Sequence, residues 1–308
     1  MKNVVVTGGN GFIGSPLISN LTEKGYNVFA IVRNKEKIGY SENEQVKYIY
    51  ADMSNYSQLD QMLPVTEIDT LYHLAWDSSS GDGRGNYRIQ CKNIEYSCDL
   101  LMACQRMKCK RFLFASSIME YEVYKQMQLA EVPPRSSIYS TGKLAADYML
   151  KALANSYCMD YISLLLSNVY GPGECSPRLI NSSIRKMLKG ERCSFSSGDQ
   201  LYDFIYIDDA IDMMIALEQD GKGNKIYYIG NSRPMALKDF LMMMHEQVAP
   251  DSPIGLGDLP SPIVELAYSE FDTDAVFKDT GVVPKVDFKE GIQKTVDYIK
   301  ESDDELCF

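Results

Sequence analysis

A tyrosine and a lysine four residues apart, Tyr139 and Lys143, carry the clearest chemical signal in this chain. On a helix, two such residues lie one turn apart on the same face. A free phenol has a pKa of about 10, and a nearby ammonium stabilises the phenolate, so the tyrosine can act as an acid or a base near neutral pH. The chain holds 21 tyrosines, so the spacing alone is weak, but it follows a predicted strand (residues 111–116) that leads into Ser117. Because polar groups at the carboxyl edge of a parallel strand face the ligand crevice, we predict that Ser117, Tyr139 and Lys143 form one catalytic group.

A glycine-rich loop follows the first predicted strand and opens the first predicted helix. Its sequence, TGGNGFIG at residues 7–14, has glycines at positions 8, 11 and 14. This spacing permits a tight turn, a close approach of the backbone to a pyrophosphate and close helix–strand packing, while the helix N-terminus supplies free N–H groups. In this strand–loop–helix context the pattern predicts a dinucleotide site rather than an ordinary turn. The residues expected to line it are Gly8, Gly11, Phe12, Ile13 and Gly14.

The end of the second predicted strand indicates which dinucleotide is bound. An NAD site usually places an acidic residue here, where it accepts a hydrogen bond from the ribose 2′-hydroxyl. This chain has Val32, Arg33 and Asn34 instead. Because a guanidinium fits a 2′-phosphate, Arg33 and Asn34 favour NADP(H) as the cofactor. NAD(H) is the alternative if Arg33 is only a solvated surface charge.

The elements that must position these residues alternate between strands and helices. Apolar, β-branched runs occur at residues 4–7, 28–32, 46–50, 70–75, 111–116 and 161–166, and helical spacing occurs at 15–24, 94–107, 141–157 and 178–189. The predicted fold is therefore α/β, a Rossmann-type doubly wound parallel sheet with a smaller C-terminal α/β substrate-binding cap. We expect residues 1–167 to form the dinucleotide-binding domain, with 203–230 returning to it. Residues 168–202 and 231–308 are then expected to form the cap.

Composition and charge argue against several other functions. Across 308 residues, 42 acidic side chains outnumber 31 basic ones, which gives a formal net charge of −11. Such a surface repels nucleic acid and anionic lipid, and no run of 18 apolar residues is present, so we expect neither partner. Only two histidines and no CxxC pair occur, so no metal site is predicted. The eight scattered cysteines, and a start without a signal-peptide core, predict reduced thiols and a cytoplasmic protein.

Together these motifs resemble the extended short-chain dehydrogenase/reductases of the NAD-dependent epimerase/dehydratase family. The resemblance covers nearly the whole chain and rests on segments 7–14, 51–52, 73–75, 114–121, 139–143, 168–172 and 203–209. It implies that Ser117 hydrogen-bonds the reacting oxygen, that Tyr139 transfers its proton, and that Lys143 holds the nicotinamide ribose. Most members of the family act on nucleotide-diphosphate sugars, with hydride moving between C4 and the nicotinamide. A homodimer through residues 94–107 and 141–157 is implied in the same way.

The resemblance also implies residues that bind the cofactor and the substrate. The cofactor residues are Asp52 and Met53 at the adenine, and Leu74 and Ala75 beside the nicotinamide ribose. For Trp76, a wall of the substrate pocket and a packing role are equally open. The residues implied for the sugar substrate are Trp76, Met119, Asn168, Arg178 and Tyr202.

Two departures from the family pattern concern the substrate's phosphates. An arginine commonly precedes the segment at 203–206 and contacts the nucleotide diphosphate, but Tyr202 stands here. A second arginine has no clear counterpart between residues 261 and 272. Arg178 and Arg185 lie seven residues apart on one predicted helix, about two turns, so they should point the same way and could replace the missing charges. The alternatives are a solvated basic helix face and a substrate without a diphosphate.

The function that these observations favour is an NADP-dependent 4-ketoreductase acting on a nucleotide-activated sugar, in which Tyr139 delivers a proton as hydride attacks the carbonyl. A 4-epimerase that retains its cofactor is the alternative within the family. A dehydratase is disfavoured, because such enzymes usually carry Asp-Glu after the catalytic hydroxyl, whereas Ile118-Met119 stand here. A non-catalytic NADP-sensing protein is the alternative from another class, and the intact Ser117, Tyr139 and Lys143 argue against it.

Overall fold

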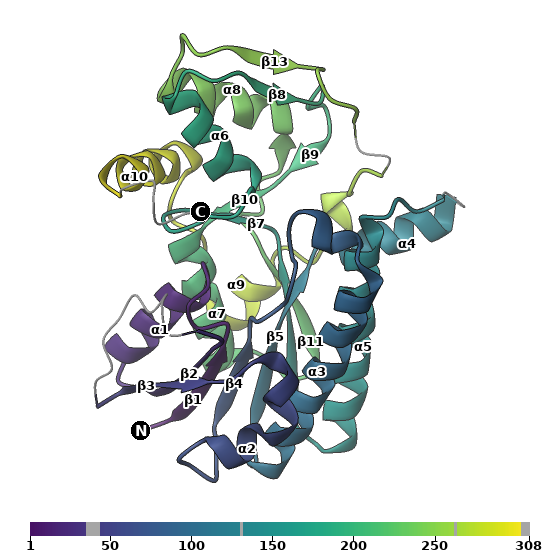
Figure 1. Ribbon diagram of the computed structural model, residues 1–308, viewed down its shortest axis with the longest axis vertical. Coiled ribbons are helices and arrows are strands. Elements are labelled where there is room, and N and C mark those ends of the chain that lie inside the picture. The colour runs from purple at the N-terminus through teal and green to yellow at the C-terminus, as the bar shows by residue number, and fades with distance from the viewer. Residues whose placement is uncertain (35–43, 130–131, 262–263, 303–308) are drawn as a thin grey trace.

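A seven-stranded parallel sheet forms the centre of the computed structural model in Figure 1, which describes residues 1–34, 44–129, 132–261 and 264–302. The strands run in the order β11-β6-β5-β4-β1-β2-β3. Because β1 lies between β2 and β4, the chain winds outward from it in both directions, as in a doubly wound Rossmann sheet, and the predicted fold class is confirmed. The strands are β1 (Asn3–Thr7), β2 (Asn27–Val32), β3 (Val46–Tyr50), β4 (Thr70–His73), β5 (Arg111–Ser117), β6 (Asp160–Leu166) and β11 (Lys225–Ile229).

Different helices cover the two faces of this sheet, because successive strand residues point to opposite sides. Val4 and Val6 of β1 belong to the core that includes Leu17 of α1, whereas Val5 packs in the core that includes Leu100 of α3. Figure 1 shows α3 and α5 side by side on their face of the sheet. The first face is covered by α1 (Gly14–Glu23) and α7 (Ile207–Asp220), and the second by η1 (Met53–Gln58), α2 (Leu59–Met62), α3 (Tyr87–Arg106) and α5 (Ser137–Ser156).

Among the element boundaries that differ from the sequence prediction, two have a clear local reason. α3 begins at Tyr87 instead of residue 94, because the side chain of Asn86 accepts a hydrogen bond from the Arg88 backbone N–H and caps a polar first turn. β4 ends at His73 instead of residue 75, since the next two backbone N–H groups donate to the Thr7 hydroxyl rather than to a neighbouring strand.

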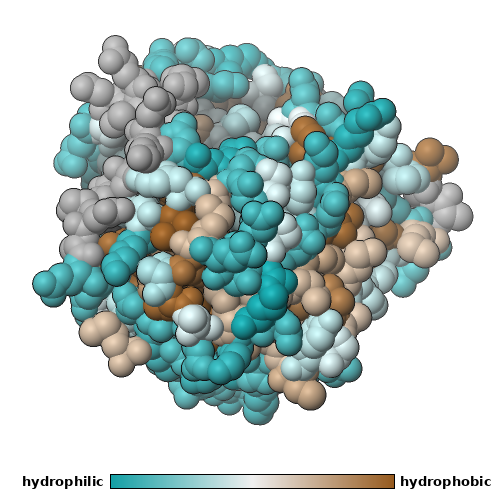
Figure 2. Space-filling view, turned by 60° about the horizontal axis from the view of Figure 1, so that its bottom comes forward, coloured by the Kyte–Doolittle hydropathy of each residue, from teal (hydrophilic) through white to brown (hydrophobic). Residues whose placement is uncertain are grey.

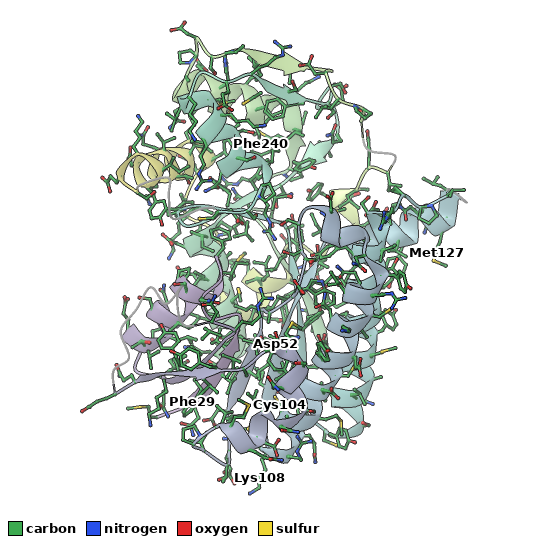
Figure 3. All side chains as sticks on the ribbon, viewed as in Figure 1. Phe29, Asp52, Cys104, Lys108, Met127 and Phe240 are labelled. Atoms are coloured by element: carbon green, nitrogen blue, oxygen red, sulfur yellow. The ribbon has the colours of Figure 1, made fainter. Side chains whose placement is uncertain are left out.

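A smaller α/β layer lies beyond the carboxyl ends of the sheet strands, at the top of Figure 1. Its core includes Phe240, whose ring centroid lies 4.7 Å from that of Phe288 and 5.0 Å from that of Phe204. Figure 3 labels Phe240 in this layer and Phe29 in the large sheet. The helices of the layer are α6 (Leu179–Leu188), α8 (Leu237–Val248) and α10 (Phe288–Glu301). Its strand pairs are β7 (Asn168–Tyr170) with β10 (Phe204–Tyr206), β8 (Cys193–Phe195) with β13 (Ile254–Leu256), and β9 (Leu201–Tyr202) with β12 (Met235–Ala236).

The C-terminal part of the chain is divided between the two layers. α8 and α10 contact each other and α6, whereas α9 (Ala275–Thr280) contacts α7 and β11 of the large layer. η3 (Tyr268–Glu270) also lies against the large layer, because Tyr268 packs with Tyr228 and Leu165. α4 (Glu120–Leu129) follows β5 and carries Met127 on its exposed side (Figure 3).

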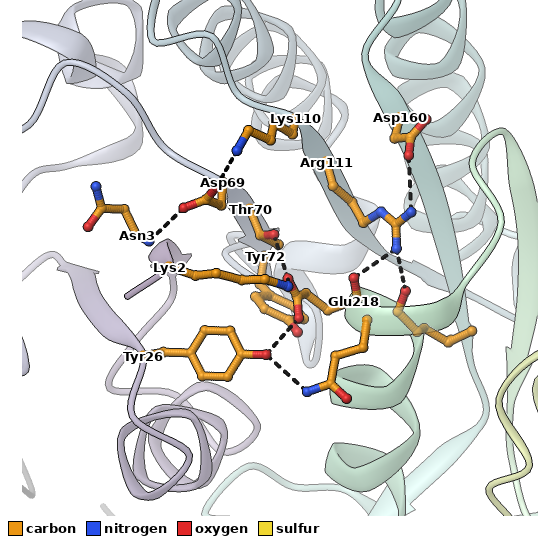
Figure 4. Close-up of polar contacts among 12 residues, drawn as sticks. Lys2, Asn3, Tyr26, Asp69, Thr70, Tyr72, Lys110, Arg111, Asp160 and Glu218 are labelled. Atoms are coloured by element: carbon orange, nitrogen blue, oxygen red, sulfur yellow. Dashed lines mark hydrogen bonds and ion pairs between the residues drawn. The ribbon is translucent and has the colours of Figure 1, made fainter.

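A buried carboxylate joins α7 to the amino-terminal end of the sheet (Figure 4). Glu218 of α7 accepts hydrogen bonds from Lys2 Nζ at 2.9 Å, from the Tyr26 hydroxyl at 2.9 Å and from the Thr70 hydroxyl at 3.0 Å. Arg111 of β5 donates to the backbone carbonyls at the end of the same helix. These bonds hold α7 against β1 and β4.

One face of the molecule can be judged by its hydropathy. Figure 2 shows a mostly hydrophilic face on which hydrophobic residues occur in small separate groups. No helix within the described ranges is long and apolar enough to cross a membrane, and no cluster of potential metal ligands occurs among the same residues. Six described cysteines are free thiols, but Cys175 is disulfide-bonded, so the expectation of reduced thiols is wrong at that residue.

Candidate active site

The glycine loop at residues 7–14 has no side chains at positions 8, 11 and 14, and we call this loop the glycine cradle. Gly8 has a φ of 70°, in the left-handed region that favours glycine, and its carbonyl accepts a hydrogen bond from Gly11 N at 2.9 Å. A Cβ on Gly14, the first residue of α1, would lie 2.1 Å from the Gly8 oxygen. The glycines therefore let α1 start directly against the loop, and the loop lines a cavity, an arrangement that fits a dinucleotide.

A buried histidine orients the loop that follows β4. His73 lies between two hydroxyls, with Nδ1 2.8 Å from Thr7 Oγ1 and Nε2 2.8 Å from Ser97 Oγ. Thr7 Oγ1 also accepts hydrogen bonds from the backbone N–H groups of Leu74 and Ala75. Burial lowers the pKa of His73 to about 3, so this side chain stays neutral and positions the cavity wall instead of transferring protons.

At the other end of the loop, the residues predicted to hold the adenosine are only partly brought together. Arg33 is exposed and lines the cavity, and Met53 lines it as well. Asp52 instead caps η1, where its carboxylate accepts from the backbone N–H and the hydroxyl of Ser54, and these bonds lower its pKa. Neither Asp52 nor Asn34 lines the cavity.

The three predicted catalytic residues lie in one cavity of about 700 Å³ between the large sheet and the smaller layer. Ser117 is the last residue of β5, and its hydroxyl accepts a hydrogen bond from Met119 N at 3.2 Å. Tyr139 and Lys143 are buried on α5, one turn apart. Lys143 Nζ donates to the Ala115 carbonyl at 2.7 Å.

The electrostatics of this group differ from the sequence expectation. Burial raises the pKa of Tyr139, and this effect outweighs the opposing influence of Arg178, Arg84 and a hydrogen bond with Ser117. Burial also lowers the pKa of Lys143 to about 7. Burial is therefore the dominant influence on the pKa of Tyr139 in this structure.

Trp76 serves both of the roles that the sequence left open. Its indole lines the cavity, and its ring lies edge-on to Tyr139 with centroids 6.4 Å apart. Lys143 Nζ lies 3.9 Å from the indole centre, within the range of a cation–π interaction. The indole N–H donates to Gln90 Oε1 of α3 at 2.8 Å, which holds the ring in place.

A buried acidic pair behind Lys143 was not predicted from the sequence. Glu120 accepts a hydrogen bond from the Ser116 hydroxyl, and Asp147 of α5 accepts one from the Tyr161 hydroxyl at 2.7 Å. Burial, and secondarily the charge of Asp147, raise the pKa of Glu120 to about 8. The available signal was an acidic residue three positions after Ser117, at the start of α4.

The cavity is lined by all the residues that the resemblance implied for the sugar substrate. Met119, Asn168, Arg178 and Tyr202 all line it, and Asn168 Nδ2 donates to the Asp203 carbonyl at 3.1 Å. Tyr202 is mostly buried and supplies no charge here.

The predicted pairing of Arg178 with Arg185 is wrong. Arg185 is buried, does not line the cavity, and donates to the Glu174 carbonyl at 3.2 Å. Arg178 precedes the first turn of α6 with extended backbone angles (φ −74°, ψ 153°), so helical spacing does not apply to it. A different arginine, Arg84 of η2 (Asp82–Gly85), shares the cavity with Arg178, and no sequence motif identified it.

A Rossmann sheet with a glycine cradle after β1, and a serine, a tyrosine and a lysine at the edge of β5, defines an extended short-chain dehydrogenase/reductase. The chain belongs to the NAD dependent epimerase/dehydratase family, whose model matches residues 4–230.

Relatives and solved structures of similar length support this assignment. The chain is 26% identical to a dTDP-glucose 4,6-dehydratase of Neisseria gonorrhoeae, with 96% of this chain and 95% of the relative covered. It is 24% identical to a CDP-abequose synthase of Salmonella typhimurium (strain LT2), with 94% and 96% covered. The structure of a UDP-N-acetylglucosamine 4-epimerase from Methanobrevibacter ruminantium M1 is similar with a TM-score of 0.81 and 25% identity, over 97% of this chain and 98% of that one.

Proposed function

We propose that this protein is an oxidoreductase that reduces a 4-keto group on a nucleotide-activated sugar. The observation that carries the proposal is the convergence of Ser117 and Tyr139 on the cavity that also contains the glycine cradle. Two hydroxyls at the carboxyl edge of the sheet suit a carbonyl oxygen, which must be oriented and then protonated.

Each residue of the group has a distinct task in this reaction. A nicotinamide dinucleotide held along the cradle would supply the hydride for the carbonyl carbon. Ser117 donates a hydrogen bond to the carbonyl oxygen and holds it next to Tyr139, which delivers its phenolic proton to that oxygen and completes the alcohol. Lys143 keeps one N–H on the Ala115 carbonyl and presents the others to the ribose hydroxyls.

The residues next to Ser117 favour reduction over loss of water. Ile118 and Met119 line the cavity at this point, and neither can act as the acid or base that expels a hydroxyl. A 4-epimerase is the second candidate, supported by the likeness to the Methanobrevibacter ruminantium M1 enzyme. The two differ in cofactor balance, because an epimerase reduces the carbon that it has first oxidised.

The cofactor and the assembly are further parts of the proposal. Arg33 at the end of β2 favours the 2′-phosphate of NADP(H) over NAD(H), and the cytoplasm is the expected location.

The exposed Tyr148 and Met149 of α5, which are 64% and 51% accessible, favour a homodimer through α3 and α5.

Replacing Tyr139 by Phe tests the chemistry. The variant keeps the ring but loses the proton, so turnover on a 4-keto sugar nucleotide should fall by about 10²–10⁴-fold, whereas the cofactor dissociation constant should change little. Stopped-flow absorbance at the nicotinamide band measures the first quantity, and calorimetry measures the second. Near-normal turnover in the variant would exclude Tyr139 as the proton donor.

The purified wild-type protein can be used to distinguish a reductase from an epimerase. A reductase consumes one added NADPH per product, and the cofactor released on denaturation should be NADP(H). Turnover of a 4-hydroxy sugar nucleotide without added cofactor would instead support the epimerase.

A further inference from the structure

Arg84 brings a positive charge to the catalytic tyrosine from the segment between β4 and α3. Its guanidinium carbon lies 4.4 Å from the centre of the Tyr139 ring, and its side chain lines the same cavity. Its Nε is buried without a hydrogen-bond partner, and within the described part of the chain its side chain makes no ion pair. A buried guanidinium nitrogen without an acceptor costs free energy, so this placement is suited to a ligand that provides one.

Arg178 brings a second positive charge from the smaller layer. It lines the cavity just before α6, and its ion pair with Glu174 is loose, with Nη1 3.7 Å from Oε2. Glu174 also accepts a hydrogen bond from Ser176 N at 2.8 Å, so its carboxylate is not committed to Arg178 alone. Arg178, Arg84 and Tyr139 line the same cavity, and both arginines oppose the rise that burial causes in the pKa of Tyr139.

The other charges of the cavity do not perform the same task. Lys143 is held by the Ala115 carbonyl and the Trp76 ring, and Arg33 lies at the end of β2 beside the glycine cradle. Asp77 and Glu174 are the acidic residues among the cavity-lining positions that the structure describes. Arg84 and Arg178 are therefore the cations placed to meet a substrate at Tyr139.

We propose that Arg84 and Arg178 together bind an oxyanion of the substrate beside Tyr139. The proposal rests on the proposed function, since it concerns the substrate of the same site, and it names a substrate class: a sugar derivative with a carboxylate next to the reacting carbon. Arg84 lines the same cavity as Tyr202, which supplies no charge there. Phosphate and carboxylate oxygens share the geometry that a guanidinium binds with two N–H groups.

The test is a set of dissociation constants measured by calorimetry on the cofactor-loaded full chain, without turnover. Arg84→Met keeps the length and the contact with the Tyr139 ring but removes the charge, and Arg84→Lys restores the charge without the planar group. Arg88→Met is the matched control, because Arg88 also lies against a tyrosine ring, 5.5 Å from the centre of Tyr87, but is exposed and does not line the cavity. The probes are UDP, UDP-glucose and UDP-glucuronate, with the CDP and dTDP compounds as further sets.

We expect Arg84→Met to weaken binding by about 10- to 100-fold, Arg84→Lys by less, and Arg88→Met by less than about 2-fold. A carboxylate contact predicts this loss for the glucuronate alone, and an equal loss for all three probes of a set would place the arginines at the diphosphate and overturn the carboxylate site. Unchanged binding of every probe by Arg84→Met would overturn the oxyanion site and leave the proposed function standing. A wild-type protein that binds no probe would overturn both, whereas a Tyr139→Phe variant that binds normally and turns over at a near-normal rate would overturn the proposed function alone.

Discussion

Lys143 and Glu120 show how strongly burial alone changes single residues at this site. Both are almost fully buried, and desolvation acts on them in opposite directions: it lowers the pKa of the lysine to about 7 and raises the pKa of the glutamate to about 8. The charge on this part of the cavity therefore changes near neutral pH. Tyr139, one turn from Lys143, lies within reach of that change.

Glu120→Gln tests this titration through stability. The folded protein keeps a proton on Glu120 from its ordinary pKa of 4.5 up to about 8, whereas the unfolded chain loses that proton at the lower value. Unfolding then releases a proton, so Glu120 makes the free energy of unfolding fall as pH rises from 4.5 to about 8. The variant cannot ionise, so this fall should be reduced.

Urea denaturation at several pH values across that range measures the effect. Glu95→Gln, an exposed substitution on α3, is the control and should keep the wild-type pH dependence. If Glu120→Gln also keeps it, another group accounts for the fall.

At the scale of elements, the turn between β1 and α1 depends on glycine residues, which have no side chain. Gly14 opens α1 directly against the carbonyl of Gly8, and the start of the helix is the end that attracts phosphate. A methyl group in this position meets backbone, which cannot move away as a flexible side chain can.

Gly14→Ala should therefore weaken cofactor binding. Overpacking of this kind costs about 1–3 kcal/mol, which corresponds to about 5- to 150-fold in the dissociation constant if the strain falls on the bound state. Calorimetry with NADP(H) and NAD(H) measures the change. Ser15→Ala, one residue further along α1, is the control. Equal cofactor affinities for the two variants would show that cofactor binding does not depend on the glycine at position 14.

At the scale of the whole molecule, one buried carboxylate joins segments from both ends of the large layer. Glu218 accepts from Lys2, Tyr26 and Thr70, so α7 is tied to the sheet although it lies about 150 to 220 positions away along the chain. The same helix packs against α1, whose N-terminus forms the cradle. The contact therefore stabilises the layer that carries the site.

Glu218→Ala should destabilise the fold without touching the cavity. The variant leaves the buried hydroxyls of Tyr26 and Thr70 without their acceptor, which costs about 1–3 kcal/mol. The midpoint of urea unfolding should fall, while the affinity for substrate stays near the wild-type value at low urea. Glu67→Ala, which removes an exposed ion pair with Lys108, should change the midpoint little, and a similar shift for both variants would contradict a special role of Glu218.

The sequence by itself determined the local features of this protein, because they depend on short-range geometry. The glycines at 8, 11 and 14 predicted the turn between β1 and α1, and the spacing of Tyr139 and Lys143 predicted their shared helix face. Continuous apolar runs such as 4–6 predicted strands covered on both faces, and alternation with helices predicted the parallel order.

Only the tertiary structure decided which distant residues meet and how they are charged. Arg84 reaches Tyr139 across 55 positions, and Glu120 comes to lie behind Lys143, and neither contact follows from a spacing within one element. Arg178 and Arg185 separate because the helix begins after Arg178, a boundary that periodicity leaves open by a residue or two. The pKa of Tyr139 is raised rather than lowered because desolvation depends on the atoms packed around a group, and that packing is a property of the folded chain.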